Sequence, residues 1–404
     1  MVVQRFGPDI AGGAEQLVRE TSERLATRGH DVEVLTSCAE SSVDWANCYP
    51  PGERVLNGVL VHRLEVQGLR PNRLFGPLTE RVRHYPDHAA VPTILSDEWT
   101  KMIGPDLPEL LPWLAESAHR FDVIVFSGYM FPTSTVGLPF AAALRPTVIQ
   151  AVAHDEPFLR LPAIRPIFEH AAGICALTVE EGELIRRRFR PQGVMSVVGA
   201  GVEAPPALEP ADVAAATDAV GLTGRRYLIS VGRIEDGKGT PELVDYFGEY
   251  LERHDPDLHL LLVGRNVSNL RRKRNVVMTD FVSEDTKWRL LAGAEALVQP
   301  SYFESFSLSL VEGWLQGLPA LVQGRCDVLA GQVRRSGGGL SYTSFSEFDA
   351  ALTVLTESAA LRQDLAESGR RYSGRYEWDV VLDAFEDLAA RSIERWHETE
   401  RSRC

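Results

Sequence analysis

The stretch Ser-Val-Gly-Arg-Ile-Glu-Asp-Gly-Lys-Gly, residues 230–239, decides the fold class. An apolar run ending at residue 231 precedes the loop and has the length of a buried strand, and a helical pattern over 241–253 follows it. A strand, a glycine-containing loop and a helix in this order are typical of a doubly wound α/β sheet. The loop carries two cations, Arg233 and Lys238, at the edge of the sheet where the strand ends.

The same alternation of short apolar runs and helical patterns extends in both directions from this loop. The predicted strands are 1–3, 32–36, 59–63, 123–126, 147–153, 173–177, 227–231, 258–263, 296–299 and 320–322. The predicted helices include 15–28, 241–253, 283–292 and one through 312–315. A proline-rich segment, 203–210, separates the two halves and predicts a linker. We therefore expect an α/β protein with two doubly wound domains, 1–203 and 204–377, which face each other across a cleft.

Composition excludes several classes of protein. The 404 residues are 44% hydrophobic and 24% charged, as in globular proteins, and their net charge of −14 argues against a nucleic-acid partner. The five cysteines are widely spaced and contain no C-x-x-C, which indicates a reduced, cytoplasmic protein. No apolar run approaches the ~18–20 residues of a membrane span, and the first residues lack the layout of a signal peptide.

The first candidate binding element is the loop that carries Arg233 and Lys238. Two cations beside a helix N-terminus, with glycines that allow close backbone approach, can hold a diphosphate. A solvated turn is the alternative, because a single Gly-Lys-Gly is common.

The second element is Pro-Ser-Tyr-Phe-Glu-Ser-Phe-Ser-Leu-Ser-Leu-Val-Glu-Gly, residues 300–313. Glu304 lies in the predicted loop and Glu312 in the helix, with seven residues between them. One carboxylate can accept hydrogen bonds from sugar hydroxyls and the other can hold a ribose diol, while the amides of residues 305–308 can face a ligand. The alternative makes Glu304 a helix cap and Glu312 a solvated residue, but apolar neighbours surround Glu312 in the sequence.

These two elements together resemble the retaining GT-B glycosyltransferases of family 4, the group 1 glycosyltransferases. The similarity covers nearly the whole chain. It includes Phe-Gly-Pro-Asp-Ile-Ala-Gly-Gly-Ala-Glu at 6–15, Val-Gly-Ala-Gly-Val at 198–202 and Phe-Val-Ser-Glu at 281–284. The chain departs from the family in its short first strand and in the segment 320–329.

The resemblance implies a role for each matching residue. Arg233 and Lys238 would bind the donor diphosphate, Glu304 the donor sugar and Glu312 the nucleotide ribose. His154 would be the active-site histidine, although a lone histidine after a strand is more often structural. The other donor-binding residues implied are Gly12, Gly13, Val282, Ser305, Phe306, Ser307 and Leu308. The last helix, 378–404, would cross back to the first domain.

We therefore expect an enzyme that moves a hexosyl unit from a nucleoside-diphosphate sugar to a hydroxyl acceptor with retention of configuration. Its acceptor is expected to be a glycan, a lipid-linked glycan or a small molecule, in polysaccharide or cell-envelope synthesis, with the inner face of the membrane as an alternative location. The alternatives are a sugar-nucleotide epimerase, a sugar-phosphate transferase and a non-catalytic sugar-nucleotide-binding protein.

We expect neither a cofactor nor a metal. Asp255-Pro-Asp257 imitates a metal-binding D-x-D motif but precedes its strand, and Pro86 interrupts the pair His84 and His88. The basic run 271–274 is interpreted as a solvated surface.

Overall fold

The computed structural model describes residues 1–10, 12–85, 91–254, 257–271 and 273–403. The chain divides into two compact units. Unit 1 contains Met1–Gly201 and Asp379–Cys404, and unit 2 contains Val202–Trp378. The sequence predicts the changes between domains after residues 203 and 377, and the structure has them after Gly201 and Trp378. Unit 1 therefore consists of two segments that are separated in the sequence by the whole of unit 2.

A single mixed sheet forms the centre of unit 1. Its strands are β1 (Glu33–Ser37), β2 (Gly52–Leu56), β3 (Val59–Leu64), β4 (Ile124–Ser127), β5 (Thr147–Gln150), β6 (Gly173–Ala176) and β7 (Val194–Val197). One part has the order β2-β3-β1 and the other β4-β5-β6-β7, and Val2 joins them through parallel bridges to Leu35 and Phe126. The predicted strand 1–3 is thus a single bridge residue in the middle of the sheet. Among the strands that the structure describes in this unit, β2 and β3 pair antiparallel and the other pairs are parallel.

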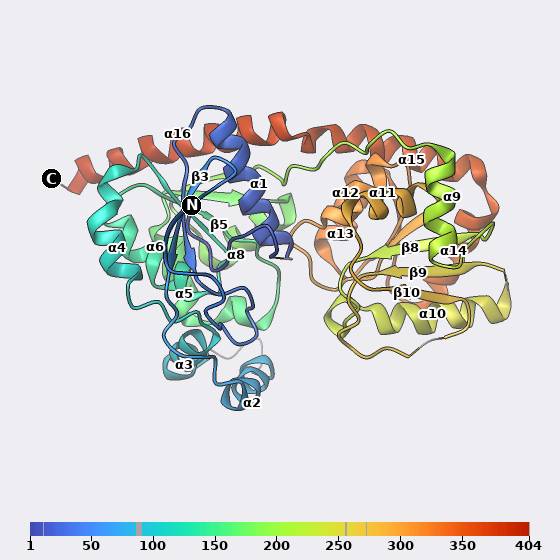
Figure 1. Cartoon of the computed structure of the whole chain (residues 1–404), viewed down its shortest axis with the longest axis horizontal. Helices are drawn as coiled ribbons and strands as arrows, with labels where there is room; N and C mark the ends of the chain where they lie inside the picture. The colour runs from blue at the N-terminus through green and yellow to red at the C-terminus, as the bar shows by residue number, and fades with distance from the viewer. Residues whose placement is uncertain (11, 86–90, 255–256, 272, 404) are drawn as a thin grey trace. The chain divides into compact units, whose positions relative to one another are not determined.

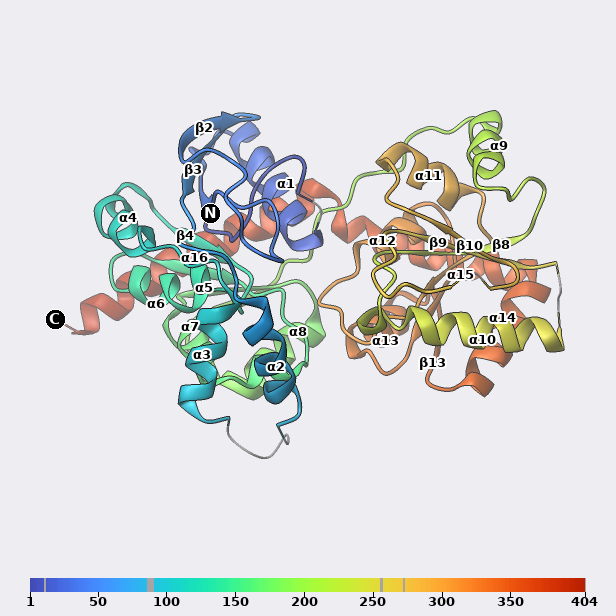
Figure 2. The same cartoon turned by 60° about the horizontal axis from the view of Figure 1, so that its bottom comes forward.

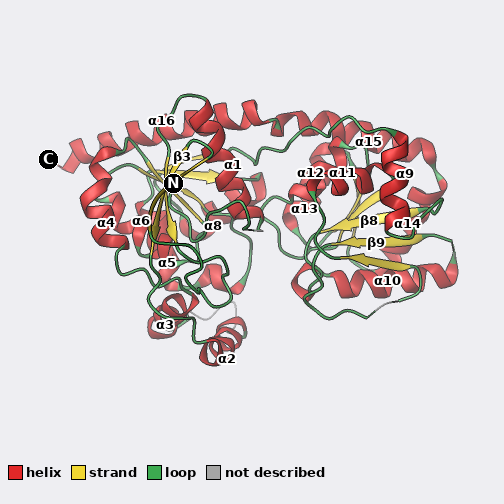
Figure 3. Ribbon diagram, viewed as in Figure 1, coloured by secondary structure: helices red, strands yellow, loops and turns green. Residues whose placement is uncertain are grey.

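Helices cover both faces of this sheet (Figure 1 and Figure 3). They are α1 (Gly13–Thr27), α2 (Asn72–Arg83), α3 (Thr93–Ile103), α4 (Leu110–Ser117), α5 (Pro132–Thr135), α6 (Gly137–Ala142), α7 (Arg165–His170) and α8 (Val179–Phe189). Figure 2 shows α1 beside β2 and β3, where Val18 of the helix packs on Val34, Val59 and Val61. Unit 1 also has a second, larger apolar core, which contains Leu114 of α4 and side chains of the strands. The central strands of the sheet are therefore buried, as strands covered on both faces are.

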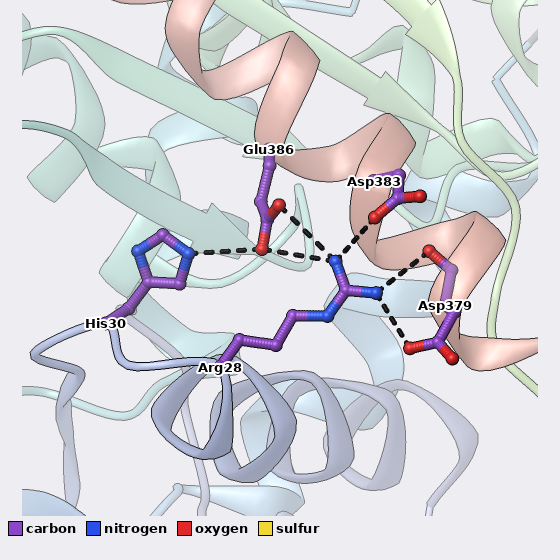
Figure 4. Close-up of polar contacts among 5 residues, drawn as sticks. All are labelled: Arg28, His30, Asp379, Asp383 and Glu386. Carbon is purple, nitrogen blue, oxygen red and sulfur yellow. Dashed lines mark hydrogen bonds and ion pairs between the residues drawn. The ribbon is translucent and has the colours of Figure 1, made fainter.

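The long helix α16 (Trp378–Arg403) docks on unit 1 through a cluster of charges at the end of α1 (Figure 4). The Arg28 guanidinium lies 2.8 Å from Asp379 Oδ1, 2.6 Å from Asp383 Oδ1 and 3.4 Å from Glu386 Oε2. Hydrogen bonds to these carboxylates raise the pKa of Arg28. The three acidic residues lie on successive turns of one helix face, which explains how a single guanidinium reaches all of them.

Further along, α16 fits closely against the sheet of unit 1. Trp396 Nε1 donates to the carbonyl of Ala142 at 3.1 Å, and the Arg391 guanidinium donates to Ser196 Oγ. A side chain at Gly173 on β6 would overlap Ser392, so glycine is the residue that lets this helix approach the strand.

Unit 2 is built on a fully parallel sheet. Its strands are β8 (Tyr227–Val231), β9 (His259–Val263), β10 (Val276–Thr279), β11 (Ala296–Gln299), β12 (Ala320–Gln323) and β13 (Gly339–Tyr342). Their order is β10-β9-β8-β11-β12-β13. The chain runs outward from β8 to β9 and β10, then returns to β11 on the other side of β8. The loops after β8 and β11 therefore lie next to each other at the switch point, where doubly wound sheets bind ligands.

The helices of unit 2 lie on both faces of its sheet (Figure 1 and Figure 3). They are α9 (Pro210–Ala219), α10 (Thr240–Arg253), α11 (Glu284–Ala292), α12 (Leu308–Leu315), α13 (Asp327–Ser336), α14 (Phe345–Glu357) and α15 (Ala359–Ser373). Phe247 of α10 and Phe348 of α14 share one apolar core with the strands. Among the residues that the structure describes, no helix is long and apolar enough to cross a membrane.

Candidate active site

The loop after β8 approaches the loop after β11 without intervening side chains. Gly239 has φ +66°, a left-handed conformation that glycine adopts without strain, and it precedes α10. A Cβ at this position would overlap the carbonyl oxygen of Pro300. Glycine is thus required on two grounds, and its contact with Pro300 brings the two loops together.

Lys238 and Glu304, one from each loop, form an ion pair. Lys238 Nζ lies 2.6 Å from Glu304 Oε1, and 29% and 12% of the two side chains are exposed. Arg233 is in a different situation, because its side chain is 67% exposed and lies 3.1 Å from Glu235 Oε1. The structure therefore pairs Lys238 with Glu304, as two of the charged residues predicted at this edge, while Arg233 extends from the same loop into solvent.

Hydrogen bonds fix the loop between β11 and α12. Gln299 Nε2 donates to Ser307 Oγ at 3.0 Å and to Ser309 Oγ at 2.8 Å. Gln332 donates to the carbonyl of Phe306, which is itself buried. Ser307 has φ +73° and precedes the first residue of α12, Leu308. The turn at Ser307 thus sets where α12 begins, and the first amides of a helix can meet an anion.

Glu312 lies inside α12 and pairs with a lysine that is not among the predicted site residues. Lys287 Nζ on α11 lies 2.7 Å from Glu312 Oε1 and 2.7 Å from Glu284 Oε2. Burial disfavours the ammonium, but the attraction of Glu312 and Glu284 is stronger in sum, so the pKa of Lys287 is raised. A lysine three residues after an acidic residue at the start of a helix was the available signal, but it also fits an ordinary surface pair.

Val282 lies just before α11 and is half-buried. Ser283 caps that helix by accepting a hydrogen bond from the amide of Thr286 at 3.2 Å, as the sequence predicts for a serine followed by two acidic residues. The cap fixes where α11 begins, and it thereby fixes the backbone of Val282 relative to Lys287 on the same helix.

In unit 1, His154 follows β5 in a turn with unusual backbone geometry. Val152 has φ +55°, a strained conformation for a β-branched residue. Glu181, at the start of α8, accepts the amide of Ala153 at 2.6 Å and that of Leu177 at 2.5 Å. Burial raises the pKa of Glu181 to about 7, although these backbone hydrogen bonds favour the ionised form. A buried carboxylate thus holds the turn that presents His154.

His154 has charged neighbours on both sides. Its Nδ1 lies 3.4 Å from Glu156 Oε1, and the hydroxyl of Tyr129 donates to the same carboxylate. Asp155 Oδ1 lies 3.5 Å from an Nη of Arg160 and 3.7 Å from an Nη of Arg188. Both guanidinium groups thus approach the residue that follows His154. Burial and the nearby Arg188 charge lower the pKa of Arg160.

Gly12 and Gly13 lie at the N-terminus of α1 in unit 1, directly after a residue outside the described part of the chain. A Cβ at Gly12 would overlap the Glu15 carboxylate, which pairs with Arg5 at 2.5 Å. The predicted site residues are thus divided between the units: Gly12, Gly13 and His154 lie in unit 1, and the others lie in unit 2.

The residues that the structure describes include no group of three or more His, Cys, Asp or Glu side chains placed to hold a metal ion. Asp257 of the predicted D-x-D decoy precedes β9 and is exposed, whereas Asp255 lies outside the described residues, as do His88 and Arg272.

Comparison with protein families agrees with this architecture. The family model "Glycosyl transferase 4-like domain" matches residues 12–201, and "Glycosyl transferases group 1" matches residues 217–372. The chain therefore belongs to the group 1 glycosyltransferases, and it is an enzyme with the GT-B fold.

Relatives of similar length carry related names. A "D-inositol 3-phosphate glycosyltransferase 2" from Catenulispora acidiphila is 28% identical over 96% of this chain and 92% of the relative. A "D-inositol 3-phosphate glycosyltransferase" from Segniliparus rotundus is 26% identical over 93% and 84%. Among solved structures, the sucrose-phosphate synthase of Thermosynechococcus elongatus has a TM-score of 0.69 at 16% identity, over 96% of this chain and 98% of that one. Anabaena HepE in complex with UDP and glucose has a TM-score of 0.68 at 15% identity, with the same coverage.

Proposed function

We propose that the enzyme transfers a hexosyl unit from a nucleoside-diphosphate sugar to a hydroxyl group, with retention of the anomeric configuration. The observation that carries this proposal is the pairing of Lys238 with Glu304 across the switch point of the unit 2 sheet, at 2.6 Å. It puts a cation suited to a diphosphate next to a carboxylate suited to sugar hydroxyls. HepE, whose solved complexes contain UDP, glucose and UDP-glucose, supports testing uridine nucleotides first.

Each residue would act on one part of the donor. Lys238 and Arg233 would bind the diphosphate, and the amides of residues 305–308 would contact phosphate and sugar. Glu304 would accept hydrogen bonds from sugar hydroxyls, and Glu312 from the ribose. The Val282 backbone would lie near the base. In unit 1, Gly12 and Gly13 would approach the diphosphate, and His154 the sugar.

The chemistry follows from the charges. The bond between C1 of the sugar and the β-phosphate oxygen breaks, and the leaving diphosphate gains negative charge that Lys238, Arg233 and helix amides stabilise. The acceptor oxygen forms its bond to C1 on the same face, and its proton passes to the departing phosphate oxygen. This route needs no second carboxylate as a nucleophile, and we propose no double displacement.

We further propose that the acceptor is a small phosphorylated sugar or polyol rather than a polymer. The names of the related proteins contain D-inositol 3-phosphate. The names of two similar solved structures contain sucrose-phosphate and trehalose-6-phosphate. Arg160 and Arg188 both approach the carboxylate of Asp155, the residue that follows His154. A phosphate on the acceptor would match two guanidinium groups in this position.

The test is a release assay with UDP-, GDP- and ADP-sugars, each with inositol phosphate, glucose 6-phosphate or the unphosphorylated compound. We expect one nucleotide sugar to be consumed, with transfer to phosphorylated acceptors at least tenfold faster than to their unphosphorylated forms. The variant R160A/R188A should lose this preference while it keeps its affinity for the donor. Conversion of the donor to an epimer without release of nucleotide would instead identify an epimerase.

A further inference from the structure

Lys287 is the most completely enclosed cation of the ion pairs described above. Its side chain and that of Glu312 are each 11% exposed, and the two charged groups lie 2.7 Å apart. Its second partner, Glu284, is 64% exposed, so water screens that pair much more strongly. Most of the electrostatic effect of Lys287 is therefore directed at Glu312.

The pair of Lys287 with Glu312 has the same form as that of Lys238 with Glu304. In both pairs a lysine approaches Oε1 of the glutamate, at 2.7 and 2.6 Å. The chain contains only four lysines against 38 arginines, and two of the four serve these two glutamates. An arginine fork tends to engage both oxygens of a carboxylate, whereas an ammonium is a point charge that engages one. Each of the two lysines therefore contacts one oxygen of its glutamate, in the manner of a point charge.

We propose that Lys287 is a positioning residue of the donor site, which holds Glu312 ionised and oriented to accept the ribose hydroxyls of the nucleotide. This inference rests on the proposed function, in which Glu312 binds the ribose. Near a donor diphosphate, a buried carboxylate would meet like charge, which favours its protonation or displacement. The ammonium of Lys287 offsets that repulsion, because it stays bound to Glu312 from the side of α11.

The test measures binding by calorimetry, so it does not depend on knowing the acceptor. The probes are the tightest binder among UDP, GDP and ADP, and its 2′,3′-dideoxy analogue. The parent protein should prefer the ribose form by about tenfold, as expected for a hydrogen bond to a charged group. The variant K287M should lose that preference: its affinity for the ribose form should fall about tenfold, and its affinity for the dideoxy form should change less than about twofold.

Two further variants separate this role from a structural one. K287M/E312Q should bind no more weakly than E312Q alone, because Lys287 acts through Glu312. K287Q retains a hydrogen-bond donor without the charge and should lose an intermediate part of the preference, and it serves as the test if K287M does not fold. K273M is the matched control, since Lys273 is exposed and pairs only loosely with Asp245 at 3.6 Å.

The outcomes distinguish two failures. The role of Lys287 is overturned if folded K287M keeps the full preference for the ribose form, or if its affinities for the two probes fall equally. Either result leaves the proposed function intact. If the parent protein binds none of the nucleotides, or does not distinguish the ribose from the dideoxy form, the assignment of Glu312 fails and this inference fails with it.

Discussion

Glu181 Oε1 accepts a hydrogen bond from the backbone N–H of Ala153 at 2.6 Å, and this bond joins the start of α8 to the turn after β5, one residue before His154. The carboxylate is fully buried, and burial raises its pKa to about 7 from an ordinary value of 4.5. The folded protein therefore binds a proton between these two pH values that the unfolded chain releases. Stability from this group is present below pH 4.5 and is lost as the pH rises toward 7.

We accordingly predict that Glu181→Gln flattens the dependence of stability on pH. Relative to this variant, the parent protein should lose up to about 3 kcal/mol of unfolding free energy between pH 4.5 and 7, at about 1.4 kcal/mol per pKa unit. Urea denaturation at several pH values measures this difference. Parallel curves for the two proteins would show that Glu181 does not titrate in this range.

The second prediction concerns the diphosphate. R233A/K238A should bind the nucleoside diphosphate at least about 100-fold more weakly, because each charged hydrogen bond contributes about 1.5–3 kcal/mol. The double variant K273A/R274A removes two exposed charges elsewhere in unit 2 and should bind normally. Equal affinity of the folded R233A/K238A protein and the parent in calorimetry would exclude these residues from the site.

The third prediction separates the two glutamates. E312Q should weaken binding of the sugar-free nucleotide, about tenfold or more, because it acts on the ribose. E304Q should bind the sugar-free nucleotide almost normally. It should cleave the sugar nucleotide at least about 100-fold more slowly, because the hydrogen bonds of Glu304 to the sugar strengthen in the transition state. Calorimetry and single-turnover rates measure the two effects, and equal losses of nucleotide affinity would contradict this division.

The fourth prediction is that catalysis needs no divalent metal. The leaving diphosphate would be met by Lys238, Arg233 and the amides at the start of α12. Turnover should therefore survive EDTA, and D255N/D257N should change the rate by no more than a few-fold. Loss of activity in EDTA, with recovery on addition of Mn²⁺ or Mg²⁺, would show that a metal ion stabilises the charge of the leaving diphosphate.

The fifth prediction concerns the docking of α16. Arg28→Ala leaves three carboxylates, including Asp379 and Asp383, without their shared cation. The melting temperature should fall, and it should fall less in 1 M salt, where such charges are screened within about 3 Å. R83A is the control, because Arg83 forms an exposed pair with Glu80 on its own helix. If the melting temperature of R28A lies below that of the parent by the same amount at every salt concentration, packing rather than charge accounts for the loss.

Much of the fold is readable from the sequence, and the omissions have a common cause. The predicted strands 227–231 and 296–299 coincide with β8 and β11, which are buried runs in the centre of a sheet. The four described strands that are absent from the prediction are β2, β7, β10 and β13, and each lies at the edge of its sheet. An edge strand is covered less completely, so its sequence need not be a continuous apolar run. All residues of β2 except Leu56 are exposed, for example.

The candidate site shows the same limit. The spacing of Glu304 and Glu312 indicates two carboxylates near one sheet edge, and the structure places both there. Which cation pairs with each carboxylate depends on the tertiary fold: Lys238 precedes Glu304 by 66 residues, and Lys287 precedes Glu312 by 25. Local sequence patterns predict the helix of Lys287 and its spacing from Glu284, but they do not predict a contact with Glu312 at such a separation.

The docking of α16 on unit 1 also sets the order in which the protein can be completed during synthesis. The ribosome makes all of Val202–Trp378 before it makes the segment that carries Asp383 and Ser392. Unit 2 is one uninterrupted segment and can finish folding as soon as it has emerged. Unit 1 is synthesised first, but its surface around Gly173 stays uncovered until α16 has been synthesised and has docked. An expression fragment of unit 1 should accordingly carry α16 joined by a short linker, whereas a fragment of unit 2 can be cut out directly.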